Sequence, residues 1–154
     1  MTIYIDGCCA VHTTKNGAWA YAVVLDDEIV FEDSGFVENT TNSRMELTSA
    51  VMATRWCIFN KVSSAEIVSD SSYLINGITE WYKTWIYNGW KTSAEDDVKN
   101  KDLWRDLIGV KSFGIVDINW TLVKGHSGDK WNEYVDSLCK LVAEQTPVRE
   151  LIGE

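Results

Sequence analysis

Four acidic residues, far apart in the chain, lie at positions where a carboxylate could take part in chemistry. Asp6 comes at the end of an alternating apolar segment and Asp70 follows a short apolar run, while Glu46 and Asp136 lie beside the apolar stripes of expected helices. Each also has an ordinary structural explanation, as a turn residue, a helix cap, a capping-box partner or a solvated helix position. No single position therefore decides between catalysis and structure.

The combination of these residues has an electrostatic consequence. Two carboxylates about 4 Å apart repel each other by roughly 4 kcal/mol at an effective dielectric constant near 20, and four in one cleft would cost a good part of a domain's stability. Bound divalent cations would remove this cost. Because oxygen ligands without His or Cys spacing suit hard ions, the residue types favour Mg²⁺ or Mn²⁺ over zinc.

The elements that must position these carboxylates follow from the hydrophobic periodicity. Period-two or short apolar segments predict strands at residues 2–9, 17–25, 28–36, 65–69 and 115–123. Helical spacing predicts helices at 43–60, 72–88 and 100–112, and a last helix with the apolar stripe Trp131, Val135, Leu138 and Val142. Three locally paired strands followed by strands reached through helices predict an α/β fold, with helices packed on a mixed sheet.

Local signals refine this prediction. The short Asp26-Asp27 connection suits a hairpin, and Ser43 with Glu46 forms a capping-box pattern that would begin the first helix. If strands 2–9 and 65–69 are parallel neighbours, Asp6 lies near the carboxyl-terminal edge where ligand sites of α/β sheets are favoured. Glu46 would then lie in the first turn of its helix, where the helix dipole favours an anion.

The composition restricts the class of protein. With 154 residues and 45% hydrophobic content, the chain is expected to form one domain over residues 1–154. No segment has the length of a membrane span or the pattern of a secretory signal, and the four cysteines form no CxxC pair, so we expect a cytoplasmic protein with reduced thiols. The net charge of −9 argues against a nucleic-acid ligand, unless carboxylates converge on bound cations.

The sequence also resembles a known family, type 1 ribonuclease H. The shared motifs occur in the family's order and span nearly the whole chain. They are Ile-Asp-Gly at 5–7, Thr-Asn-Ser-Arg-Met-Glu-Leu at 41–47, Ser-Asp-Ser at 69–71, Gly-Ile-Thr-Glu-Trp at 77–81, Gly-Trp-Lys-Thr at 89–92, Val-Lys-Asn-Lys-Asp-Leu-Trp at 98–104, Val-Lys-Gly-His-Ser-Gly at 123–128 and Asn-Glu-x-x-Asp at 132–136. Any one of them is a weak signal, whereas their joint occurrence is highly specific.

The resemblance implies a ribonuclease H-like fold, with a five-stranded mixed sheet in the order 3-2-1-4-5 flanked by helices. It implies an endoribonuclease that hydrolyses the RNA strand of RNA/DNA hybrids and leaves 5′-phosphate and 3′-hydroxyl ends. Asp6, Glu46, Asp70 and Asp136 would hold two Mg²⁺ ions, with Mn²⁺ as a possible substitute. His126 resembles the family histidine that assists proton transfer or product release.

The same resemblance suggests substrate contacts. Trp81, Trp85 and Trp90 would lie against the DNA strand, although their spacing alone favours core packing. A DNA-phosphate pocket is implied for Thr41 and Asn100, and an RNA contact for Asn42.

The chain also departs from the family's pattern. The basic cluster that many members carry is reduced to Lys83 and Lys91, so we expect weak, metal-dependent affinity for the hybrid. Ser43 and Ser72 replace the Asn and Gln that are common near the RNA, and His12 lies in the first loop.

Two other functions are compatible with this pattern. One is a nuclease of the same fold that acts on a junction or on DNA alone, and the second is a noncatalytic module that binds hybrids. The Arg-Met-Glu-Leu and tryptophan motifs speak against the first. A pure binder of polyanions gains nothing from converging carboxylates, which speaks against the second. We expect a monomer with no obligatory protein partner and no membrane association.

Overall fold

The computed structural model describes residues 1–10, 15–112, 114, 116–125 and 127–145. Its centre is a five-stranded sheet in the order β3-β2-β1-β4-β5. The strands are β1 (Thr2–Cys9), β2 (Gly17–Leu25), β3 (Glu28–Val37), β4 (Ser64–Ser69) and β5 (Asp117–Leu122). The pairs β1–β2 and β2–β3 are antiparallel, and β1–β4 and β4–β5 are parallel. The predicted mixed sheet and its strand order are confirmed.

The hairpin between β2 and β3 follows the sequence signal. Asp26 and Asp27 both have left-handed backbones, with φ of 53° and 58°. Two successive left-handed residues are typical of a type I′ turn, whose twist matches that of the paired strands. The two-residue connection therefore sets the antiparallel register of Leu25 opposite Glu28.

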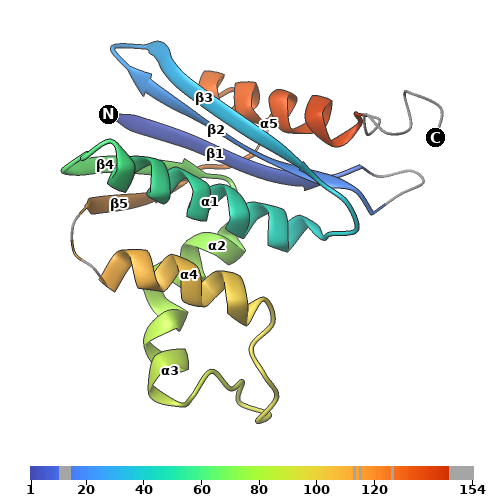
Figure 1. Cartoon of the computed structure of the whole chain (residues 1–154), viewed down its shortest axis with the longest axis vertical. Helices are drawn as coiled ribbons and strands as arrows, with labels where there is room; N and C mark the ends of the chain where they lie inside the picture. The colour runs from blue at the N-terminus through green and yellow to red at the C-terminus, as the bar shows by residue number, and fades with distance from the viewer. Residues whose placement is uncertain (11–14, 113, 115, 126, 146–154) are drawn as a thin grey trace.

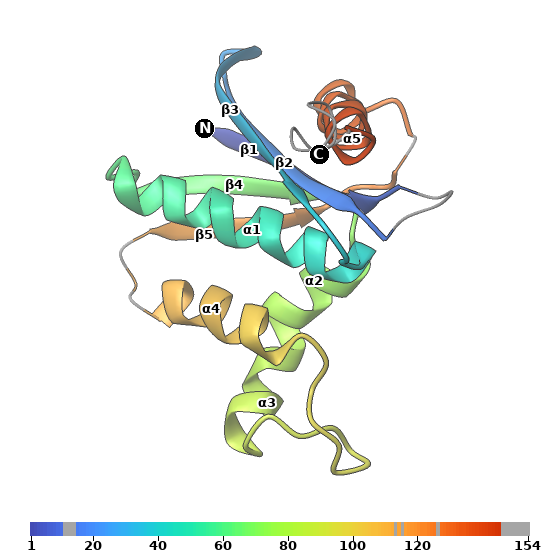
Figure 2. The same cartoon turned by 45° about the vertical axis from the view of Figure 1, so that its right-hand side comes forward.

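Helices cover both faces of the sheet. They are α1 (Asn42–Phe59), α2 (Ser72–Asn76), the π-helical turn η1 (Gly77–Trp81), α3 (Tyr82–Tyr87), α4 (Lys101–Ser112) and α5 (Lys130–Ala143). Figure 1 shows α1 across one face with α4 beyond it, and Figure 2 shows α5 on the opposite face over β1 and β2. Because the sheet separates α1 from α5, residues of these two helices can meet in one site only at an edge or end of the sheet.

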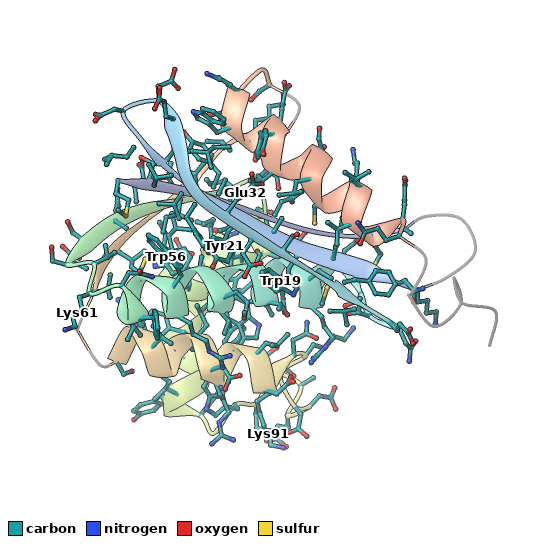
Figure 3. All side chains as sticks on the ribbon, turned by 45° about the horizontal axis from the view of Figure 1, so that its top comes forward. Trp19, Tyr21, Glu32, Trp56, Lys61 and Lys91 are labelled. Atoms are coloured by element: carbon teal, nitrogen blue, oxygen red, sulfur yellow. The ribbon has the colours of Figure 1, made fainter. Side chains whose placement is uncertain are left out.

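Most of the core lies between the sheet, α1 and α4. Ile3 and Ile5 of β1 point into it, and Trp104 of α4 is fully buried there. Figure 3 shows Trp19 and Tyr21 between the sheet and α1, with their rings stacked at 6.2 Å between centroids. The alternation of β1 sends its even-numbered residues, among them the acidic one, to the face that α5 covers.

Two helices differ from the expectation, one in its N-cap and one in its internal geometry. The N-cap of α1 is Thr41, whose hydroxyl accepts a hydrogen bond from the Arg44 amide, so the capping box predicted from Ser43 and Glu46 is wrong. Glu46 consequently lies beyond the first turn, and its carboxylate is available for other contacts. The predicted helix 72–88 covers the correct span but contains the π-helical turn, where Gly77 packs directly against the Trp104 ring.

Among the helices of the described residues, none combines the length and the apolar character needed to cross a lipid bilayer.

Candidate active site

Asp6 and Asp70 lie at the point where two parallel strands part. The register places Tyr4 of β1 opposite Val68 of β4, and β4 ends at Ser69. Two residues after the last pair, Asp6 and Asp70 therefore lie level with each other and on the same face of the sheet. The parallel neighbourhood expected from the sequence is confirmed, and both carboxylates lie at its carboxyl-terminal end.

Glu46 reaches this point because Gly7 lets α1 approach β1 very closely. A Cβ atom built on Gly7 would collide with the backbone of Met45 and Glu46, near the N-terminal end of the helix. Only a residue without a side chain permits this approach. The motif Asp-Gly at 6–7 is therefore a packing requirement as well as a candidate site.

Asp136 lies on α5, which covers the face of the sheet opposite to α1, and this is the face to which Asp6 points. Its carboxyl group lies within hydrogen-bonding range of that of Asp6 and contributes to the raised pKa of Asp6. Asp136 also forms an ion pair with Lys140, one helical turn further on, at 3.0 Å between Oδ2 and Nζ. This contact raises the pKa of Lys140.

The electrostatic cost expected from the sequence is concentrated on Asp6. Burial, followed by the charges of Asp70 and Asp136, raises the pKa of Asp6 to about 9. In the described structure, its buried Oδ2 atom has no hydrogen-bond partner. Burial also raises the pKa of Glu46, with Asp70 contributing and a hydrogen bond from Ser71 opposing. A buried carboxylate surrounded by others strongly favours a bound cation.

Ser71 connects two parts of the site. Its hydroxyl donates to Glu46 Oε2 at 2.7 Å and accepts from the Leu74 amide at 3.1 Å. The same residue thus caps α2 and orients a carboxylate of α1. The role of helix cap, which was the ordinary structural explanation for Asp70, belongs to Ser71, and this leaves the Asp70 carboxylate available for other contacts.

These observations can be compared with the needs of a divalent metal ion. The donor set is all oxygen, as Mg²⁺ prefers, and the partnerless Oδ2 of Asp6 is the kind of atom that such an ion would satisfy. Among the described residues, no three acidic, His or Cys side chains are arranged tightly enough to enclose an ion. The four carboxylates instead interact electrostatically in pairs, from Glu46 through Asp70 and Asp6 to Asp136. The all-oxygen chemistry of the four carboxylates therefore fits Mg²⁺.

The residues expected at a DNA phosphate lie beside the N-terminus of α1. Thr41 caps the helix, and Asn100 has a left-handed backbone with φ of 59°. Asn100 accepts a hydrogen bond from Arg44 at 3.4 Å and donates one to the Tyr73 hydroxyl at 3.2 Å. Arg44 in turn is held by Asp102 at 2.8 Å. The structure thus brings Thr41 and Asn100 to one place, around an arginine that the sequence had not singled out.

Asn42, the residue expected to contact RNA, also has a structural role. Its Oδ1 accepts a hydrogen bond from the Cys9 amide at 2.7 Å, so it ties the start of α1 to the end of β1. Its side chain remains exposed, as a substrate contact would require.

The three tryptophans divide between core and surface. Trp85 and Trp90 are half-buried against the core, and the ring of Trp85 lies 5.1 Å from that of Trp104. Trp81 is 39% exposed, with its ring 6.0 Å from Trp85. Packing therefore accounts for much of Trp85 and Trp90, and Trp81 presents the most accessible of the three rings.

Comparison with known proteins identifies the family. The family model of ribonuclease H, described as RNase H, matches residues 1–144. The chain belongs to the ribonuclease H family. A ribonuclease H of Hahella chejuensis is 41% identical over 152 residues, which cover 99% of this chain and 95% of the relative. The resemblance inferred from the motifs is thus confirmed, and the chain is a nuclease of the hydrolase class.

Solved structures agree with the ribonuclease H fold. LC9-RNase H1, a type 1 ribonuclease H with the type 2 active-site motif, superposes with a TM-score of 0.78 at 24% identity, covering 99% of this chain and 80% of that one. The foamy viral protease-reverse transcriptase, solved in complex with an RNA/DNA hybrid, superposes with a TM-score of 0.81 at 16% identity, covering 94% of this chain and 20% of that one. The fold predicted from the sequence is confirmed.

The histidine suggested for this ribonuclease H, His126, lies outside the described residues, as does His12. Gly125, the residue before His126, is described and lies close to the site, since a Cβ atom built on it would be 3.1 Å from Asp70 Oδ2. Gly125 therefore lies beside a candidate metal ligand.

Several residues at the site of this ribonuclease H were not predicted from its sequence. Lys140 could have been found, because a cation four residues after Asp136 lies on the same helix face. No local signal pairs Arg44 with Asp102, since they are 58 residues apart and meet only through packing.

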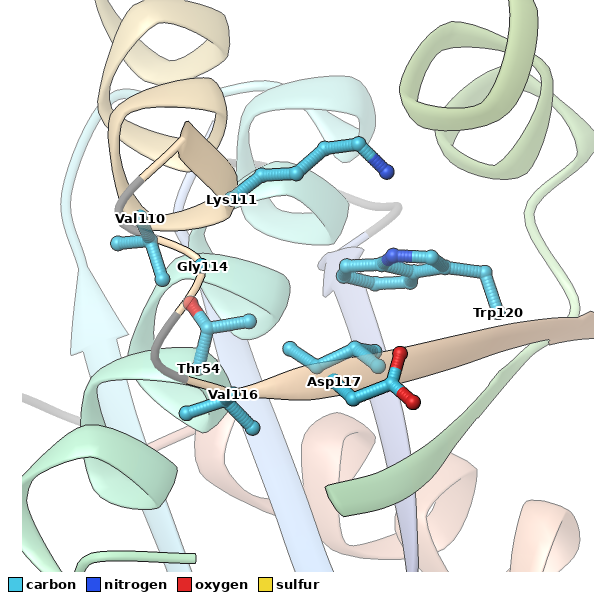
Figure 4. Close-up of a pocket in the computed structure, with 8 residues that line it drawn as sticks. Thr54, Val110, Lys111, Gly114, Val116, Asp117 and Trp120 are labelled. Atoms are coloured by element: carbon cyan, nitrogen blue, oxygen red, sulfur yellow. The ribbon is translucent and has the colours of Figure 1, made fainter. Parts of the chain in front are cut away.

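A pocket of about 430 Å³ lies elsewhere on this ribonuclease H, between α4 and β5. Figure 4 shows Lys111 and Asp117 on either side of the Trp120 ring at this pocket. None of the four carboxylates lines it, so it is separate from the candidate active site.

Proposed function

We propose that this ribonuclease H is an endonuclease that hydrolyses the RNA strand of RNA/DNA hybrids with two divalent metal ions, leaving 5′-phosphate and 3′-hydroxyl ends. The observation that carries the proposal is the meeting of four carboxylates from β1, α1, α5 and the end of β4, with Asp6 buried and its Oδ2 partnerless in the described structure. Such a group suits the binding of cations and a polyanionic substrate.

The chain's own residues would divide the work. Asp6, Glu46, Asp70 and Asp136 would hold the ions, and Ser71 would keep Glu46 oriented. When bound, Mg²⁺, or Mn²⁺ in its place, would activate the attacking water and stabilise the leaving 3′ oxygen. His126 would assist proton transfer or product release.

Substrate contacts are proposed around this centre. Thr41 and Asn100 would bind a phosphate of the DNA strand, with Arg44 beside them as a cation. Asn42 would contact the RNA strand. The Trp81 ring would lie against DNA sugars, and Trp85 and Trp90 would support it from the core. We propose that the chain acts as a monomer without an obligatory protein partner.

Cleavage of labelled RNA/DNA hybrid, duplex RNA and duplex DNA, in parallel with Mg²⁺, Mn²⁺ or a chelator, tests this function. We expect cleavage of the hybrid's RNA strand only, and none with chelator. Asp70→Asn should lower the rate by more than about 100-fold, beyond the effect of residues that merely orient a metal ligand.

The matched control is Asp117→Asn, which removes the same charge from an exposed position of β5 and should cleave like the wild type. An intact hybrid after incubation of the wild type with Mg²⁺ would refute the proposal. Cleavage of duplex DNA or of a junction instead would favour the alternative nuclease function. Metal-independent hybrid binding without any cleavage would favour the noncatalytic module.

A further inference from the structure

One cation, Lys140, lies beside the cluster of four carboxylates. Its ammonium group lies 3.0 Å from Asp136 Oδ2, and within the described residues no other lysine or arginine pairs with any of the four carboxylates. The Asp136 side chain is 21% exposed, whereas that of Lys140 is 57% exposed. Lys140 thus reaches from the solvent to the edge of the site.

Lys140 occupies a position that matters for a metal ion. Asp136 links the lysine to Asp6, because its carboxyl group lies within hydrogen-bonding range of the Asp6 carboxyl. The Lys140 ammonium group already holds the Asp136 carboxylate, and this same carboxylate would ligate a divalent ion. A carboxylate cannot give its full charge to both partners, so the lysine and the ion compete for it.

We propose that Lys140 is a displaceable counter-ion, which holds Asp136 in the metal-free protein and sets the divalent-ion concentration at which the site fills. This inference rests on the proposed function, because it assumes that Asp136 is a metal ligand. Lys140 is accordingly a positioning residue that acts through Asp136.

The physical properties of the pair suit this role. A lysine has a flexible four-carbon stem, and the exposed Lys140 can swing into water at little cost. A divalent ion brings twice the charge and binds the carboxylate oxygen directly, so it displaces the ammonium instead of being excluded. An arginine at this position would hold the carboxylate with two parallel hydrogen bonds and compete more strongly.

Calorimetric titration of the full chain with Mg²⁺, in the absence of nucleic acid, tests the inference. We expect Lys140→Gln to bind Mg²⁺ about three- to fivefold more tightly than the wild type, the range that a partly exposed ion pair supports. Lys140→Arg should bind as the wild type does or more weakly. The difference between Lys140→Gln and wild type should shrink at high salt, because salt screens the competing pair.

Lys130→Gln is the matched control. It removes the same charge from the same helix and breaks an ion pair with Asp27, at 3.3 Å, that lies in the β2–β3 turn. Its Mg²⁺ affinity should stay within about twofold of the wild type, as expected for a remote screened charge. Equal tightening in the two variants would overturn the inference, since the effect would then be one of net charge.

A second readout separates this role from a structural one. In hybrid cleavage, Lys140→Gln should reach half-maximal rate at a lower Mg²⁺ concentration, with the saturated rate unchanged. If the wild type binds Mg²⁺ but Lys140→Gln binds it equally or less tightly, the inference is wrong and the proposed function stands. If the wild type binds no divalent ion, the proposed metal mechanism fails together with the inference.

Discussion

At the scale of single residues, Asp6 determines much of the site's behaviour. It is buried beside two other carboxylates, with one oxygen partnerless in the described structure, and its pKa is raised to about 9. An aspartate in an unfolded chain titrates near pH 4, so at neutral pH folding either binds a proton at this position or confines an unfavourable charge. The metal-free protein therefore loses folding free energy to its own active site.

The sign of this effect gives a prediction for Asp6→Asn. Because the folded pKa is raised, the contribution of Asp6 to stability is fully present below its unfolded pKa and is lost as the pH rises toward about 9. In chelator at pH 7.5, the variant should melt roughly 3–8 °C above the wild type, since 1 kcal/mol corresponds to about 2–4 °C in a domain of this size. Below about pH 4, the variant and the wild type should melt at the same temperature.

Thermal unfolding by circular dichroism at the two pH values measures this difference. Saturating Mg²⁺ should reduce the difference in melting temperature between Asp6→Asn and the wild type at pH 7.5, because the wild type then gains the free energy of ion binding. Asp117→Asn, at an exposed position, should show no comparable gain. A destabilised Asp6→Asn protein at pH 7.5 in chelator would contradict the electrostatic account.

At the scale of elements, the site depends on how closely α1 lies to β1. Gly7 allows the backbone at Met45 and Glu46 to pass directly over the strand. The same helix is fastened at its start by Asn42 to the end of β1 and by Thr41 as its cap. These contacts set the depth at which the Glu46 carboxylate reaches the strand ends.

Gly7→Ala tests this dependence. The added methyl group meets rigid helix backbone instead of a side chain that can move, so we expect a loss of roughly 1–3 kcal/mol in the free energy of unfolding. Urea denaturation measures this loss. Cleavage activity should fall as well, because α1 must carry Glu46 away from the other three proposed metal ligands.

Gly109→Ala is the opposing control. Gly109 lies within α4 and a Cβ there would meet nothing within 4 Å, so alanine should stabilise the helix by up to about 1 kcal/mol. If Gly7→Ala were as stable as the wild type, the close approach of α1 and β1 would not be the constraint inferred here.

At the scale of the whole molecule, charge opposes the binding of a polyanion. The net charge is −9, and several cations near the expected substrate surface are already paired. Arg44 is held by Asp102, and Lys91 by Asp97 at 2.6 Å. Bound divalent ions would therefore supply an important part of the attraction for phosphate.

This balance predicts that hybrid affinity depends on metal. The variant Glu46→Gln lacks one proposed ligand and should be inactive, so it suits a binding measurement by fluorescence anisotropy with labelled hybrid. It should bind the hybrid at least about tenfold more tightly in Mg²⁺ than in chelator at 150 mM salt. The salt dependence without metal should be shallow, since few free lysines and arginines meet phosphates. Tight binding in chelator at that salt concentration would show that the remaining cations suffice.

The sequence by itself determined the elements and the candidate ligands of this protein. Strands 2–9 and 17–25 and the helix at 100–112 are found where hydrophobic periodicity predicted them, because that periodicity records which face of each element is buried. The motifs further identified the family and its strand order. Local patterns were sufficient to predict these strands and helices, because the periodicity that distinguishes a strand from a helix is visible within a few consecutive residues.

Only the tertiary structure decided how the candidates meet. The capping of α1 by Thr41, the hydrogen bond from Ser71 to Glu46 and the buried state of Asp6 each depend on packing between distant segments. A carboxylate's pKa and partners are set by the solvent it loses and by the charges that approach it. Neither quantity is encoded in the neighbouring residues, so the sequence could nominate these carboxylates but could not show how they act on one another.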